Sequence, residues 1–204
     1  MNHLFARRRK RSTRDIVLIL ALAIVVAGVT WIASGCGSPE ATHAGALPDI
    51  SLVDQNGKPV VLSSLKGKPL LVDFIYTSCP GPCRTLTQSM ERIAQKLGPA
   101  LGQQVTFVSI SIDPEHEGPP QLLSYSKALD ANRAGWFFLS GSPDQIDATL
   151  SAFGLRRERA PGGDIEHFEE VILVGADGRE FKVYKGDVLH TDSVLADLQE
   201  AAHG

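Results

Sequence analysis

The hydrophobic residues of this chain gather in short, mainly apolar runs, separated by segments with helical spacing. These runs have the length of buried strands and cover Leu70–Ile75, Val105–Ile112 and Trp136–Leu139. After the first run, Leu86, Met90 and Ile93 are spaced by four and three residues, which predicts a helix. Gly98-Pro99 is a typical helix end, so this helix should stop there.

The remaining elements follow from turn and capping residues. Helices are predicted at Pro119–Leu129, from an N-cap at Ser142 with Pro143 and Gln145 to about Phe153, and at Asp192–Ala202. Hairpins are predicted at Ile50–Leu62 around Asn56-Gly57, and at Val171–Val174 with Glu180–Tyr184 around Ala176–Gly178. Arg156–Asp164 reads as a polar loop. This order predicts an α/β fold, in which helices flank a central mixed sheet and a β-hairpin is added at its N-terminal side.

The N-terminal segment differs from the rest of the chain. Residues 1–15 hold six basic residues and one acidic residue, and Ile16–Ser34 is a run of 19 uncharged, mostly apolar residues. Such a run can span a bilayer, and the basic residues before it keep the N-terminus in the cytoplasm. Small residues directly before Cys36 resemble a bacterial lipobox, so a lipid on Cys36 and a retained membrane helix both remain possible. Either places the following domain on the extracytoplasmic side of the cell membrane.

We therefore divide the chain into an anchor or signal segment (1–36), a linker (37–46) and one folded domain (47–204). The whole chain carries a net charge of −3 and the first 15 residues carry about +5, so the rest carries about −8. An acidic domain gives no reason to expect nucleic-acid binding.

Two cysteines follow directly on the first buried strand. Cys79 and Cys83 are separated by Pro80-Gly81-Pro82 and lie where the predicted helix begins. Unpaired backbone N–H groups and the positive end of the helix dipole favour thiolates at such a position. An exported domain can form disulfides, but a bridge closing so small a loop adds little stability. The two cysteines therefore form either a reactive dithiol or part of the ligand set of a soft metal ion.

These motifs resemble the Sco/SenC family, which has a thioredoxin-like fold. The resemblance rests on Gly67-Lys68-Pro69, Tyr76–Cys83, Ser109–Pro114, and His167 eight residues before Gly175-Ala176-Asp177-Gly178. It implies a copper chaperone for cytochrome c oxidase. One copper ion, Cu(I) or Cu(II), would be held by Cys79, Cys83 and His167. Two thiolates and one imidazole form a ligand set suited to copper.

The resemblance also implies partners. The acceptor would be the oxidase subunit that carries the copper A site, to which the protein delivers copper or whose cysteines it reduces. Another copper chaperone and a thiol reductant are further expected partners. A metallochaperone is favoured over an enzyme. Of the other histidines, we expect His116 to be solvated, and we leave it out of the site together with His43, His190 and His203.

Asp73 leaves open a second hypothesis for the function of the two cysteines. It is a carboxyl in an otherwise apolar strand, six residues before Cys79, and a buried carboxylate there could accept a proton from the second thiol. In that reading the protein is a thiol-disulfide reductase with Cys79 as nucleophile and Cys83 as resolving thiol, and without a metal role. The alternative for Asp73 is a strand-end residue that faces water or pairs with a lysine. Asp113 either orients a ligand or partner, or caps a turn.

Overall fold

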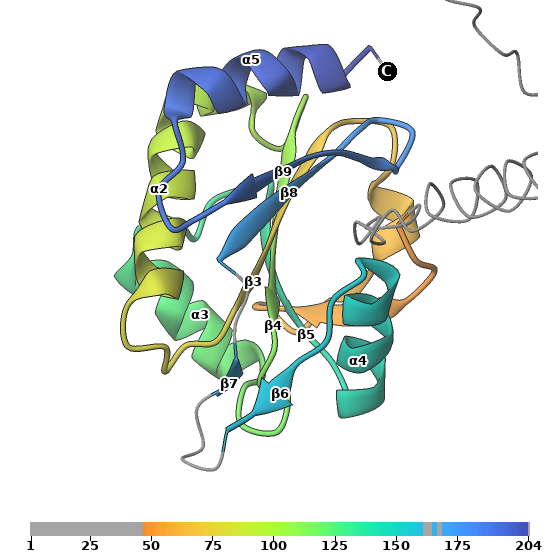
Figure 1. The fold of residues 1–204 in the computed structure, drawn as a ribbon, viewed down its shortest axis with the longest axis vertical. Coiled ribbons are helices and arrows are strands. Elements are labelled where there is room, and N and C mark those ends of the chain that lie inside the picture. Colours follow the sequence, from red (N-terminus) through yellow and green to blue (C-terminus); the bar gives the residue numbers. More distant parts are fainter. Residues whose placement is uncertain (1–46, 161–164, 167–168, 204) are drawn as a thin grey trace, which may run out of the picture. The chain divides into compact units, whose positions relative to one another are not determined.

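The computed structural model describes residues 47–160, 165–166 and 169–203, and a mixed seven-stranded sheet forms its centre (Figure 1). The strand order is β2-β1-β5-β4-β3-β8-β9. The strands are β1 (Ser51–Asp54), β2 (Pro59–Val61), β3 (Leu70–Ile75), β4 (Thr106–Ser111), β5 (Trp136–Ser140), β8 (Glu170–Val174) and β9 (Glu180–Lys185). β3, β4 and β5 are parallel, whereas the flanking strands run antiparallel to their neighbours.

Helices cover both faces of this sheet. They are α2 (Pro82–Leu97), α3 (Pro119–Ala128), α4 (Pro143–Ala152) and α5 (Thr191–Ala201), with 3-10 turns η1 (Leu62–Leu65) and η2 (Gly98–Ala100). The β3-α2-β4 and β4-α3-β5 crossovers advance in the same direction along the sheet, which places α2 and α3 on the same face. On that face the ring of Tyr125 packs 6.2 Å from Phe138. On the other face Phe153, at the end of α4, packs 5.5 Å from Phe74.

Three neighbouring strands of the sheet are fully buried. Every residue of β3, β4 and β8 is buried, including polar residues such as Asp73, Ser109 and Glu170, as expected for strands covered on both faces of the sheet. The predicted capping pattern of α4 is also present: the Ser142 hydroxyl accepts the Gln145 N–H at 3.3 Å, and the Gln145 amide oxygen accepts the Ser142 N–H at 2.7 Å. The α/β class, the mixed sheet and the N-terminal hairpin β1–β2 are thus confirmed.

One strand of a short antiparallel ladder lies inside the predicted polar loop Arg156–Asp164, and the other follows directly after that loop. β6 (Glu158–Arg159) pairs with β7 (Ile165–Glu166), and Ile165 is buried there. Burial of this one apolar side chain in an otherwise polar segment gives the ladder a hydrophobic anchor. Residues 161–164, between the two strands, lie outside the described part of the chain.

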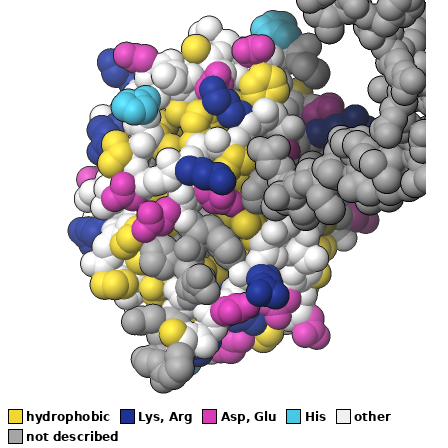
Figure 2. Space-filling model, viewed as in Figure 1, with side chains coloured by type: hydrophobic (Ala, Val, Ile, Leu, Met, Phe, Trp, Pro, Cys, Tyr) yellow, Lys and Arg dark blue, Asp and Glu magenta, His cyan; other side chains and the backbone are white. Residues whose placement is uncertain are grey.

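In the described residues no helix has the length and apolar character needed to cross a membrane. The apolar run Ile16–Ser34 and Cys36 lie outside those residues, so the predicted anchor and the domain boundaries stay predictions. Figure 2 shows acidic and basic side chains interspersed on one face of the molecule. Many charged side chains of this domain lie within ion-pair distance of an opposite charge, for example Arg157 with Asp147 and Lys182 with Asp197.

Candidate metal and thiol site

The cysteine loop lies between the buried strand β3 and helix α2. After Tyr76 the chain turns, and the Cys79 N–H closes that turn on the Tyr76 carbonyl at 3.1 Å. Pro82 opens α2 and needs no hydrogen-bond partner there, because proline has no backbone N–H. The carbonyl of Gly81 accepts the N–H groups of Arg84 and Thr85, so the first helical turn is formed directly beyond the cysteine loop.

The two thiols lie next to each other. The backbone N–H of Cys83 points at the Sγ of Cys79 at 3.4 Å, and both cysteines are free thiols. The N-terminal end of α2 therefore directs a backbone N–H group at the Cys79 sulfur. Cys79 is half-buried and Cys83 is 3% exposed, so Cys79 is the more accessible sulfur.

The environment keeps Cys83 protonated in the absence of metal. Burial raises the pKa of the Cys83 thiol far above its ordinary value, and the hydrogen bond with Cys79 raises it further. Cys83 must lose its proton to bind a metal ion or to attack a disulfide. A metal ion with its positive charge, or a neighbouring base, is therefore needed before Cys83 can act.

A buried carboxyl group lies beneath the thiols. Asp73 is fully buried on β3, and this burial raises its pKa to about 7. The Ser109 hydroxyl offsets only part of that rise, and no hydrogen bond of normal geometry reaches either carboxylate oxygen within the described residues. Burial raises the pKa of the partly buried Tyr125, and the nearby Asp73 and Cys83 raise it further, so Tyr125 lies within electrostatic reach of both groups. Asp73 faces the interior and not water, which excludes the exposed alternative.

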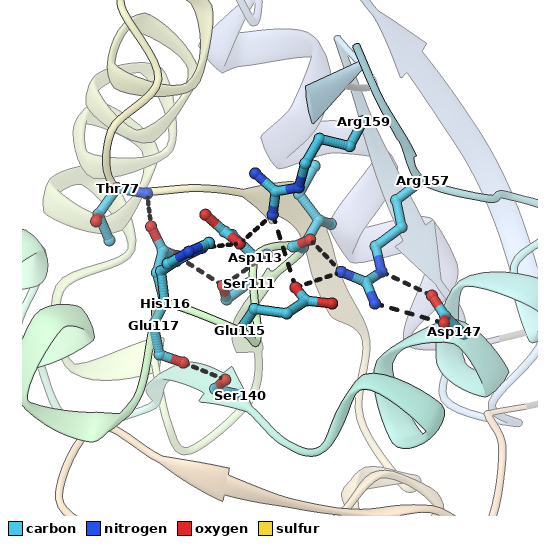
Figure 3. A network of polar contacts seen from close by, with 11 residues as sticks. Thr77, Ser111, Asp113, Glu115, His116, Glu117, Ser140, Asp147, Arg157 and Arg159 are labelled. Atoms are coloured by element: carbon cyan, nitrogen blue, oxygen red, sulfur yellow. Dashed lines mark hydrogen bonds and ion pairs between the residues drawn. The ribbon is translucent and has the colours of Figure 1, made fainter. Parts of the chain in front are cut away.

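Polar residues at the ends of β3 and β4 tie the cysteine loop to the rest of the domain (Figure 3). Glu117 is buried, and its carboxylate accepts the backbone N–H of Thr77, two residues before Cys79. The other carboxylate oxygen accepts the Ser111 hydroxyl at 2.6 Å. The parallel strands β3 and β4 end at the same edge of the sheet, and this is why residues 40 positions apart meet.

Asp113 belongs to the same network. Its Oδ1 lies 2.6 Å from an Arg159 nitrogen and 2.8 Å from Nδ1 of His116. The side chain thus joins the end of β4 to β6, which is more than a local turn cap. Arg157 lies beside it and binds Glu115 at 2.6 Å and Asp147 at 2.7 Å. Figure 3 shows both arginines extending from the β6 segment toward these carboxylates.

The structure brings together only part of the predicted metal site. Cys79 and Cys83 are adjacent, whereas His167 lies outside the described residues, so its role as a ligand stays a prediction. Among the described residues no group of three or more His, Cys, Asp or Glu side chains could hold a metal ion. Of the excluded histidines, the side chain of His116 is 68% exposed and His190 and His203 are exposed, whereas His43 is not described.

Reasoning from the sequence missed Glu117, Arg157 and Arg159. A signal for Glu117 was present, because the acidic stretch Asp113-Pro114-Glu115-His116-Glu117 follows a buried parallel strand. Polar groups at the carboxyl ends of neighbouring parallel strands are expected to meet. No comparable signal marks the two arginines, which lie in a segment that reads as a solvated loop.

The fold and the dithiol at the start of α2 define a thioredoxin-like domain. The sequence model of the SCO1/SenC family matches residues 39–203. The SCO1 protein homolog of Bacillus subtilis is 35% identical over 154 residues, which is 73% of this chain and 79% of the relative. The chain therefore belongs to the SCO1/SenC family.

Two solved structures share both fold and sequence similarity. Bradyrhizobium japonicum ScoI with copper bound has a TM-score of 0.68 and 28% identity, covering 77% of this chain and 99% of that chain. BsSco, described as a member of the Sco family of cytochrome c oxidase assembly proteins with a disulfide switch, has a TM-score of 0.67 and 32% identity. That match covers 77% of this chain and 93% of BsSco.

Proposed function

We propose that this chain is a membrane-tethered, extracytoplasmic Sco-type protein that carries one copper ion on Cys79, Cys83 and His167. The copper is cargo, delivered to the copper A centre of cytochrome c oxidase, or the same dithiol reduces the cysteines of that centre. The observation that carries the proposal is the pair of free, adjacent thiols at the N-terminus of α2, joined by the Cys83 N–H contact to Cys79 Sγ at 3.4 Å. Family membership and the copper-bound relative support it.

Each residue has a definite part in such a transfer. The sulfurs of Cys79 and Cys83 bind the ion as thiolates, and the more accessible Cys79 is the sulfur that an acceptor reaches first. A site with three protein ligands leaves an open edge, where an acceptor thiolate can attack. The ion then passes by ligand exchange, and the buried Cys83 is the last sulfur to release it.

Metal titration tests this proposal. Reduced protein is titrated with Cu(I) and with Cu(II), and we expect one ion per chain and a thiolate-to-Cu(II) charge-transfer band. His167→Ala should lose about 10- to 100-fold in affinity, as loss of a ligand usually costs at least as much as loss of an outer-shell partner. His203→Ala is the matched control, since this side chain is exposed and its ring nitrogen is hydrogen-bonded to the Gln199 carbonyl at the end of its own helix. Native affinity in His167→Ala would refute the three-ligand site.

Asp73 favours a second function, thiol-disulfide reduction, which could coexist with copper binding. The Cys79 thiolate attacks a substrate disulfide, and one substrate thiolate leaves. Asp73, whose raised pKa of about 7 makes it a competent base near neutral pH, takes the proton of Cys83. The Cys83 thiolate then attacks Cys79 Sγ, which releases the second substrate thiolate and leaves a Cys79–Cys83 disulfide. An external thiol reductant restores the dithiol.

A disulfide-reduction assay distinguishes this function from copper transfer. Insulin with excess dithiothreitol is the substrate, and no metal is present. We expect Asp73→Asn to slow the reaction about 10- to 100-fold, at the lower end of a general-base contribution. Copper affinity should change less, because Asp73 is not a ligand. Equal turnover by wild type and Asp73→Asn would refute a role for Asp73 in the reductase.

A further inference from the structure

Glu117 is a buried carboxylate that lies next to the cysteine loop without belonging to it. It follows β4 in the turn before α3, and the residue is only 5% exposed. One carboxylate oxygen accepts the Thr77 N–H, and the other accepts the Ser111 hydroxyl at 2.6 Å. A buried carboxylate is costly unless it is hydrogen-bonded, and here both oxygens are.

The backbone of Glu117 is fixed from two further directions. Its N–H donates to the Asp113 carbonyl at 2.9 Å, and its own carbonyl accepts the Ser140 hydroxyl at 2.7 Å. Ser111 and Ser140 end the neighbouring strands β4 and β5 (Figure 3). The carboxylate is therefore held by the rigid edge of the sheet, and not by a loop that can move with the cysteines.

The contact with Thr77 transmits this rigidity to the thiols. Thr77 is inside the turn that the Cys79 N–H closes on the Tyr76 carbonyl at 3.1 Å. Fixing the Thr77 N–H fixes the turn, and the turn sets where the Cys79 sulfur lies relative to Cys83 at the start of α2. Thr77 is half-buried and water could satisfy its N–H. A buried carboxylate is therefore not needed merely to satisfy this N–H, and its presence there indicates that Glu117 has a role in positioning the turn.

We propose that Glu117 is a positioning residue for the dithiol: it clamps the Tyr76–Cys79 turn and holds both sulfurs in the geometry of the reduced form. The clamp raises copper affinity, because the two thiolates need no rearrangement before they bind. It also favours the dithiol over the disulfide, since the disulfide ties the sulfurs together covalently and depends less on the turn. The statement about copper rests on the proposed function, whereas the statement about the dithiol does not.

The test compares Glu117→Ala, Glu117→Gln and Glu91→Ala in the full-length chain in detergent. Glutamine keeps an oxygen that accepts from Thr77, so this variant should rescue the function. Glu91 is a comparably buried carboxylate on α2, paired with Arg133 and outside the cysteine loop, so its loss controls for a general loss of stability.

The first readout is the dithiol-disulfide equilibrium of Cys79 and Cys83 in metal-free protein, set by a dithiothreitol redox buffer. The disulfide takes two electrons and two protons from dithiothreitol to give two thiols. We expect Glu117→Ala to shift the equilibrium toward the disulfide about tenfold, which corresponds to about 30 mV. Glu117→Gln and Glu91→Ala should stay within about threefold of wild type. An equilibrium of Glu117→Ala equal to that of Glu91→Ala overturns the proposal.

The second readout is copper affinity and the thiolate-to-Cu(II) band of the reduced protein. Glu117→Ala should bind copper about tenfold more weakly, the lower end for a residue that acts through another. If wild type binds no copper, the proposed function fails, and the redox comparison still decides the role of Glu117. If Glu117→Ala does not fold, Ser111→Ala removes one anchor of the carboxylate. It should shift the same equilibrium in the same direction, and an unchanged equilibrium would overturn the clamp.

Discussion

The backbone N–H of Cys83 points at the sulfur of Cys79, 3.4 Å away, while both residues remain free thiols. One N–H at the start of a helix thus points at the accessible sulfur, whereas burial raises the pKa of the Cys83 thiol. The two thiols have different environments although they are four residues apart. The reduced pair is prepared for a ligand or a disulfide partner that arrives at Cys79 first.

This arrangement predicts that oxidation blocks copper loading. A metal ion needs deprotonated sulfurs, and a disulfide offers no anionic ligand. The oxidised protein should therefore take up no copper with high affinity, and reduction should restore uptake fully. Bound copper should in turn slow oxidation of both thiols. The measurement is free-thiol content and copper uptake before and after dithiothreitol treatment. High-affinity uptake by the oxidised form would place the metal away from Cys79 and Cys83.

A second prediction concerns the N-terminal segment. A chain that starts near Thr42 should fold, stay soluble and bind copper as the full chain does, because the sequence of the predicted linker from Ser38 shows no pattern of core residues. Circular dichroism and copper titration check this, and insolubility of the shortened chain would contradict the predicted boundary. In cells, a lipid label attached to wild type and absent from Cys36→Ser would decide for a lipoprotein over a retained membrane helix.

The dithiol and its strand could be predicted from the sequence because their signals are local. An apolar run predicts β3, and Pro82 with the spacing of Leu86 and Met90 predicts α2, so both cysteines fall at the junction. Element ends differ by a few residues at most, as for β4, predicted at Val105–Ile112 and observed at Thr106–Ser111.

The contacts around the dithiol could not be predicted in the same way. Glu117 meets Thr77 across 40 residues, and Arg159 meets Asp113 across 46. Periodicity and capping report on neighbours along the chain, and these pairs depend on how strand ends align in the sheet. Burial of Asp73, in contrast, was one of the two alternatives that the sequence left open, and its complete burial in the structure decides between them.

Arg157 supports the third prediction, because it holds the β6 segment through two carboxylates. Its side chain is only 14% exposed, and it binds Glu115 and Asp147 at 2.6 and 2.7 Å. Arg157→Ala should lower the free energy of unfolding by about 1–2 kcal/mol, more than an exposed pair contributes and less than a fully buried one. Arg179→Ala is the control, since that side chain is 79% exposed and lies 3.9 Å from Asp177. Urea unfolding measures both.

The ion pair between Arg157 and Glu115 should make a pH-dependent contribution to the free energy of unfolding. The hydrogen bond from Arg157 lowers the pKa of Glu115 below its usual 4.5. A carboxyl with a lowered pKa in the folded state contributes its full stability above its unfolded pKa, and this contribution is lost progressively as the pH falls from the unfolded pKa through the lowered folded pKa. The difference between wild type and Arg157→Ala should therefore shrink between pH 5 and pH 3. A difference that grew over this range would show that the ion pair with Glu115 is not the cause.

Asp73 gives the last prediction, in which burial of a carboxyl changes the stability of the whole domain with pH. Folding raises its pKa from 3.8 to about 7, so the folded state keeps a proton that the unfolded state loses. Stability from this group is complete below pH 3.8 and falls as the pH rises to about 7, by about 1.4 kcal/mol per pH unit. Above pH 7 both states are ionised and the loss is constant.

Asp73→Asn removes this titration. The free energy of unfolding of Asp73→Asn minus that of wild type should rise by about 4 kcal/mol as an upper figure between pH 4 and pH 7.5. Cys83 and Tyr125 stay protonated over this range, because burial raises the pKa of each, so the change belongs to Asp73. The control is Asp130→Asn, an exposed site whose positive φ of 55° asparagine also tolerates. Urea unfolding of the reduced proteins gives the two curves. Parallel curves for wild type and Asp73→Asn would mean that Asp73 is ionised in the folded protein throughout, and it could then not serve as the base for Cys83 near neutral pH.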